Sequence, residues 1–145
     1  MPARPEPATM PHLNLQLSGT PDADLSRRAT ALIADLTVEV LGKPRELIAI
    51  AVHYVDRAHW FIDGRSMEEW GRNAYHLDIS ITDETNTKGE KARYLEQVHA
   101  RLSELIGNVH DTSYIHIIDA RAAAYGYGGS SQERRYQLAQ LRAEP

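Results

Sequence analysis

The sequence contains no cysteine and only one phenylalanine among its 145 residues, and basic residues are not in excess. The absence of cysteine excludes disulfides, a thiolate nucleophile and zinc sites that need thiolate ligands. With 16 Lys and Arg against 20 Asp and Glu, the formal net charge is -4, so nucleic acid and anionic membranes are not expected partners. No apolar run approaches the roughly 20 residues that span a bilayer, and the first residues lack the apolar segment of a signal peptide. We therefore expect a cytoplasmic protein.

Hydrophobic residues make up 42% of the chain, which is enough for the core of one domain at this length. Residues 1–9 contain three prolines and no apolar periodicity, which predicts a disordered N-terminal extension. We expect the folded domain over residues 10–131. A C-terminal tail over residues 132–145 follows, and its pattern allows a short helix.

An internal repeat runs through the domain. Residues 12–17 alternate apolar with polar side chains, and residues 76–81 do the same 64 positions later. Such alternation is typical of a strand with one buried face. Two further strands are predicted from the apolar segments 48–55 and 114–118.

A helix is predicted between the strands of each repeat. In the first repeat, Thr20 followed by proline indicates the start of the helix, and Gly42 indicates its end. In the second repeat, Thr87 and Glu90 have the spacing of a capping box, and Gly107 ends the apolar stripe.

Each repeat closes with an aromatic, glycine-containing turn, at residues 60–66 and 125–131. The chain therefore reads β-α-β twice, over about 11–66 and about 75–131. Because one β-α-β unit buries little surface alone, we predict an α+β fold. Its two repeats would form one four-stranded mixed sheet with both helices on one face, plus short hairpins. The strand at 48–55 is apolar on both faces, so the sheet needs a further partner, and we expect a homotrimer.

Three motifs point to a known family. Met10-Pro11 precedes the first strand, Gly42-Lys43-Pro44 ends the first helix, and the run from Tyr114 to Asp119 leads into the second aromatic turn. Together with the doubled strand-helix-strand pattern, these motifs resemble the tautomerase superfamily, which includes 4-oxalocrotonate tautomerase and macrophage migration inhibitory factor. The resemblance covers residues 10 to about 131. It implies a double-length member that assembles as a trimer, with active sites between subunits.

The resemblance also implies an activity, the keto–enol tautomerisation of a small 2-oxo acid without a cofactor. Pro11 matches the catalytic N-terminal proline, whose amine acts as the general base. Lys43 matches a lysine that faces the substrate's carbonyl or carboxylate and would stabilise the enolate. Tyr114 matches a tyrosine that reaches the site across the subunit interface.

The residues that would bind the substrate are less completely matched. Four are candidates: Trp60, His116, Arg65 and Arg121. Trp60 matches the aromatic residue that walls the pocket of 4-oxalocrotonate tautomerase, and His116 stands where the macrophage factor has an asparagine. The two arginines that hold a dicarboxylate in 4-oxalocrotonate tautomerase are replaced by Pro21 and Ala49, which argues against such a substrate.

The role of Pro11 depends on where the mature chain begins. While Pro11 is bonded to Met10, its nitrogen is a tertiary amide and has no basicity. Two alternatives therefore stay open: a non-catalytic trimeric protein that binds a ligand or another protein, and a decarboxylase or hydratase of the same superfamily. Pro11 could also simply start a strand, although the second copy starts its strand with Asn73-Ala74-Tyr75 and no proline.

The histidines do not form a recognisable metal motif. None of the seven belongs to a His-Glu-x-x-His arrangement, and we expect no metal site. They are His12, His53, His59, His76, His99, His110 and His116.

Overall fold

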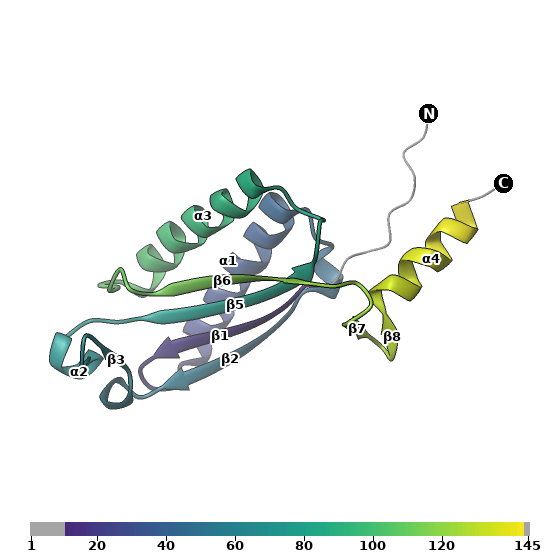
Figure 1. The fold of residues 1–145 in the computed structure, drawn as a ribbon. Helices are drawn as coiled ribbons and strands as arrows, with labels where there is room; N and C mark the ends of the chain where they lie inside the picture. The colour runs from purple at the N-terminus through teal and green to yellow at the C-terminus, as the bar shows by residue number, and fades with distance from the viewer. Residues whose placement is uncertain (1–10, 144–145) are drawn as a thin grey trace.

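The computed structural model of the protein describes residues 11–143 (Figure 1). The predicted extension at residues 1–9 lies outside the described residues, as does Met10. The main elements follow the predicted order, and they are β1 (His12–Ser18), α1 (Ala23–Leu41), β2 (Ala49–Val55), β5 (Tyr75–Thr82), α3 (Lys88–Ile106) and β6 (Tyr114–Ala120).

Shorter elements connect or follow these six. After β2 come the hairpin strands β3 (Phe61–Ile62) and β4 (Arg65–Ser66) and the one-turn helix α2 (Met67–Trp70). After β6 come β7 (Gly126–Tyr127), β8 (Ser130–Ser131) and α4 (Gln132–Ala143), and α4 extends away from the sheet. Two 3-10 turns, η1 (Arg45–Leu47) and η2 (Arg57–His59), flank β2.

The sheet has the strand order β2-β1-β5-β6. The central pair β1 and β5 is antiparallel, while β2 lies parallel to β1 and β6 lies parallel to β5. Both long helices, α1 and α3, cover the same face of the sheet (Figure 1). This confirms the predicted α+β fold with a four-stranded mixed sheet.

The core lies between the sheet and the two helices. Leu15 and Leu77, which pair across the two central strands, are fully buried. They pack in one apolar cluster with Ile33 and Leu36 of α1 and Leu102 of α3. Alternate residues of each strand enter this cluster because successive side chains of a strand point to opposite faces.

The helix ends follow local capping chemistry, with one difference from the prediction. Helix α1 is capped by Asp22, whose Oδ1 accepts a hydrogen bond from the backbone N–H of Leu25 at 3.0 Å, so the predicted start at Thr20 is wrong. An aspartate is a strong N-cap acceptor, and it lies three residues before that orphan N–H. Gly42 ends α1 in the left-handed conformation, with φ at 69°. At α3, the predicted capping box of Thr87 and Glu90 is confirmed.

No helix among the described residues covers the second face of the sheet (Figure 1). On β1, His12, Asn14 and Gln16 are exposed there, and on β6 so are Tyr114 and His116. None of the helices in the described range is long and apolar enough to cross a membrane.

Candidate active site

Pro11 lies at the head of β1, beside the C-terminal end of β5. The residue after it, His12, pairs with Ser80 in the antiparallel register. Pro11 is therefore level with Ile81, one residue before Thr82. The Pro11 side chain is buried.

Lys43 lies at the same end of the molecule and is buried. It follows the Gly42 cap of α1, and only 3% of its surface is exposed. Its Nζ donates a hydrogen bond to Thr85 Oγ1 at 3.0 Å, and Thr85 Oγ1 in turn donates to the backbone oxygen of Thr82 at 2.5 Å. Burying an ammonium group is unfavourable unless its donors are used, so Thr85 fixes where the Lys43 charge lies.

A cavity of about 960 Å³ opens beside these residues, and we call it the first cavity. Its walls come from the end of α1, from the end of β5 and the loop that follows it, from the segment after β6 and from the start of α4. The described residues that line it include Lys43, Thr82, Thr85, Ala122 and Tyr136. Its size is typical of a small-molecule site.

The first cavity is acidic. Three carboxylates line it, from Asp83, Glu84 and Glu133, and Lys43 is the cation among its described lining residues. None of these described residues is an arginine. The predicted cation Arg121 precedes the lining residue Ala122 and is exposed. A molecule with several negative charges is therefore poorly matched to this cavity, whereas Lys43 can hold one negative oxygen.

Sequence reasoning missed three polar residues of this region. Besides Thr85 and Thr82, Tyr125 contributes through a 2.5 Å hydrogen bond between its hydroxyl and Thr82 Oγ1. Burial raises the pKa of the Tyr125 hydroxyl, partly offset by that hydrogen bond. For Thr82 and Thr85 the only sequence signal was the polar run at residues 82–86, directly after the predicted strand at residues 76–81, and it is equally typical of an ordinary loop.

The remaining predicted site residues lie elsewhere. Trp60 is 7% exposed and meets the ring of His76 at 4.7 Å between centroids. On its other side His76 meets Tyr114 at 5.7 Å, and Tyr114 is 63% exposed on the open face of the sheet. Burial lowers the pKa of His76, and the carboxylate of Asp78 opposes that shift.

Arg65 and His116 complete this second group. The Arg65 guanidinium lies over the ring of Trp70, 4.1 Å from its centroid. The Nδ1 atom of His116 is 3.9 Å from Asp78 Oδ1 on the open sheet face. Within the described residues there is no cluster of three or more potential ligands that could hold a metal ion.

The region of Pro11 and Lys43 and the second group, around Trp60 and Tyr114, are far apart within one chain. Tyr114 pairs with His76, which is level with Gln16 of β1. Gln16 lies five residues beyond Pro11, a separation of about 17 Å at the rise of an extended strand. One copy of the chain therefore places Pro11, Lys43 and Arg121 at the same end of the sheet, although Pro11 and Arg121 are not among the lining residues of the first cavity. Trp60, Tyr114, Arg65 and His116 lie in the second group.

Comparisons with known proteins agree with this architecture. No protein-family model matches the sequence, and the search of curated proteins finds no match. Solved structures do match: the symmetric trimer of a wild-type fused 4-OT is 16% identical, with a TM-score of 0.70 over 85% of this chain and 97% of that one. A macrophage migration inhibitory factor-like protein from Entamoeba histolytica is 19% identical, with a TM-score of 0.65 over 84% of this chain and 98% of its own.

A third structure, N1, is a member of the cis-3-chloroacrylic acid dehalogenase family. It is 17% identical, with a TM-score of 0.65 over 91% of this chain and 92% of its own. The chain thus has the fold of tautomerase-superfamily proteins, and the resemblance in its motifs is confirmed at the level of the fold.

Proposed function

We propose that the protein is an isomerase that catalyses the keto–enol tautomerisation of a small 2-oxo acid. The observation that carries this proposal is the buried ammonium group of Lys43 on the wall of a cavity beside the head of β1. Pro11 stands at that strand head, level with the residue before Thr82 of the cavity wall, and in our proposal its amine and the Lys43 ammonium act on the same small molecule. The tautomerase-superfamily fold supports the proposal.

Pro11 is the general base of the proposed reaction, on the condition that it is the first residue of the mature chain. Its secondary amine removes a proton from C3 of the 2-oxo acid, and the C–H electron pair becomes the double bond between C2 and C3. The carbonyl electrons move onto oxygen, which then receives the proton. The Lys43 ammonium stabilises the negative oxygen during the transfer. An amine in apolar surroundings beside a cation has its pKa lowered toward neutrality, where it serves as a base.

The substrate class follows from the charges of the first cavity. Asp83, Glu84 and Glu133 repel a second or third carboxylate, while Lys43 can hold one. A 2-oxo monocarboxylate fits this balance better than a dicarboxylate.

A neighbouring subunit supplies the rest of the proposed site. Tyr114 and Trp60 lie too far from Pro11 of their own chain, and Tyr114 is exposed on the uncovered sheet face. In a homotrimer this face would lie against another copy and bring Tyr114 to that copy's Pro11. The fused 4-OT neighbour described as a symmetric trimer supports such an assembly.

The test follows the ketonisation of enol phenylpyruvate by ultraviolet absorbance. The enzyme starts at Pro11, and its comparison is the Pro11→Ala variant with the same start. We expect the variant to be slower by about 100-fold or more, which is a usual contribution of a general base. Circular dichroism confirms that both are folded. Equal rates in the two proteins would refute the proposal.

A second candidate is a non-catalytic trimer that binds a ligand or a protein. The bond between Met10 and Pro11 in the numbered sequence favours it, because the amide nitrogen has no basicity. Intact-mass measurement on protein from its native host separates the two candidates, since catalysis needs a chain that begins at Pro11. Product analysis on 3-oxo acids and unsaturated acids would reveal a decarboxylase or hydratase instead.

A further inference from the structure

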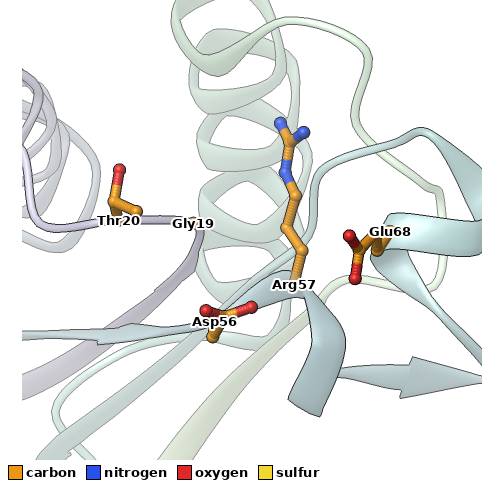
Figure 2. A pocket seen from close by; sticks show the side chains of 5 residues that line it. All are labelled: Gly19, Thr20, Asp56, Arg57 and Glu68. Carbon is orange, nitrogen blue, oxygen red and sulfur yellow. The ribbon is translucent and has the colours of Figure 1, made fainter.

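A second cavity lies at the opposite end of the sheet from Pro11. It has a volume of about 440 Å³, and the described residues that line it are Gly19, Thr20, Asp56, Arg57 and Glu68. These residues follow the C-terminal ends of β1 and β2 or belong to α2. Figure 2 shows the Arg57 side chain between Thr20 and Glu68, with Asp56 below it in this view.

The second cavity is the repeat-related counterpart of the first. Gly19 and Thr20 correspond to Asp83 and Glu84 at the offset of 64 that relates β1 to β5. Arg57 and Glu68 correspond to Ala122 and Glu133 at the offset of 65 that relates β2 to β6. A hollow lined at four repeat-related positions therefore lies at each end of the sheet.

The second cavity lacks the groups proposed for catalysis. The position of Pro11 is taken by Tyr75, which is fully buried and whose hydroxyl lies 2.6 Å from His99 Nδ1. The position of Lys43 is taken by Asn108, whose Nδ2 donates to the backbone oxygen of Gly71 at 2.8 Å. Neither residue offers a base or a cation to the cavity.

A cation is nevertheless present, at another position. Arg57 stands where the first cavity has only Ala122, and its Nη2 donates to the side-chain oxygen of Asn73. That hydrogen bond orients the guanidinium without neutralising it. Among the described residues, Arg57 forms no ion pair within 4.0 Å, although Asp56 and Glu68 line the same hollow. A guanidinium keeps further donors in a planar fork that suits a carboxylate.

We propose that the second cavity is a non-catalytic binding site for a small zwitterion of the amino-acid class. The ligand's carboxylate pairs with Arg57, and its ammonium group lies against Glu68 and Asp56. A simple anion would meet two carboxylates here, and a simple cation would meet the guanidinium, so a molecule with both charges is the best match. This site does not depend on the proposed tautomerase activity, because none of its residues belongs to the first cavity.

The test is a titration of the full chain followed by the backbone amide signals of its NMR spectrum. Three matched probes are L-alanine, propanoate, which lacks the amine, and ethylamine, which lacks the carboxylate. We expect L-alanine to shift the signals of Gly19, Thr20, Arg57 and Glu68, and to bind about tenfold more tightly than either partial probe. Arg57→Gln should weaken L-alanine binding by about tenfold or more, which is the usual contribution of a charge-assisted hydrogen bond.

Two further variants keep this test decisive. Glu68→Gln should weaken L-alanine but not propanoate, and it leaves the Arg57–Asn73 contact in place. Arg28→Gln is the matched control, because Arg28 is exposed on α1 and its ion pair with Asp24 spans 3.8 Å at the surface; binding should be unchanged. Equal binding of propanoate and L-alanine, signal shifts that survive Arg57→Gln, or no shifts at these residues would each overturn the proposal. If the proposed tautomerase activity were refuted, these binding outcomes would be unaffected.

Discussion

Lys43 combines near-complete burial with a defined hydrogen-bond partner. Its Nζ reaches Thr85 Oγ1, and Thr85 is held by the backbone oxygen of Thr82. A lysine that only complemented the helix dipole would need neither burial nor such a chain of bonds. This geometry gives the ammonium a fixed direction, which is what stabilisation of a developing negative oxygen requires.

Removing the Lys43 charge should therefore affect the chemistry more than the fold. For an enzyme that starts at Pro11, we expect Lys43→Met to lower kcat for enol phenylpyruvate by about 100-fold, in the range of a lost electrostatic stabiliser. Thr85→Val should have a smaller effect of the same sign, since the charge remains but loses its hydrogen bond to Thr85 Oγ1. Steady-state kinetics measure both.

The control for this pair is Lys88→Met, which removes an exposed lysine at the start of α3. It should retain the parent rate. If Lys43→Met is as active as Lys88→Met, Lys43 has a structural role only.

At the scale of the elements, the two long helices are joined by a buried polar contact. Thr37 Oγ1 of α1 and the Tyr94 hydroxyl of α3 are 2.8 Å apart, and both residues are fully buried. Burial raises the pKa of Tyr94 to about 12, although the hydrogen bond with Thr37 opposes the shift. The helix pair is thus sensitive to the ionisation of one hydroxyl.

This contact predicts an alkaline loss of stability. The folded pKa of Tyr94 lies above the ordinary value of about 10, so the folded state holds the proton more tightly than the unfolded state between about pH 10 and 12. The free energy of unfolding should then fall as pH rises above 10, by up to about 1.4 kcal/mol per unit for this group. Urea denaturation at pH 9, 10 and 11 measures the slope.

The comparison variant is Tyr94→Phe. It should cost about 1 kcal/mol at neutral pH, because Thr37 Oγ1 still donates to the Ile33 carbonyl at 2.7 Å. Its alkaline slope should be shallower than that of the parent. Tyr75, whose pKa burial also raises, would account for what remains. An unchanged slope would contradict the role of Tyr94.

The elements themselves were largely predictable from the sequence. The structure has the strands predicted from alternation over residues 12–17 and 76–81, and the capping box predicted from Thr87 and Glu90. Both signals depend only on neighbours a few residues away. The predicted start of α1 at Thr20 was wrong because Thr20 and Asp22 are both possible N-caps, and Asp22 supplies the stronger acceptor.

At the scale of the whole molecule, the antiparallel pairing of β1 with β5 sends the two repeats in opposite directions. Pro11 and Tyr114 consequently lie at different positions along the sheet, about 17 Å apart at the rise of a strand. If both act on one substrate, they belong to different copies of the chain.

Subunit mixing tests this arrangement directly. Chains carrying Pro11→Ala and chains carrying Tyr114→Phe, each starting at Pro11, are unfolded together in equal amounts and refolded. If each site joins Pro11 of one subunit to Tyr114 of the next, about a quarter of the sites should hold both native residues, and activity should rise to about a quarter of the parent's. Separately refolded variants are the control.

No gain of activity on mixing would place both residues in one chain or exclude Tyr114 from the reaction. Light scattering of the same samples gives the number of subunits. A monomer would contradict the proposed trimer whatever the rates.

Local sequence information was sufficient for the two β-α-β repeats, their buried faces and most helix ends, since periodicity and capping involve residues close along the chain. It also singled out Pro11 and Lys43, through motifs at the ends of elements. Long-range pairing decided the rest. The β1–β5 register places the C-terminal end of β5 beside Pro11, the chain folding brings Thr85 to Lys43, and the opposed repeats put a cavity at each end of the sheet. These contacts join residues more than forty positions apart, and no local pattern specifies which of many polar side chains will meet.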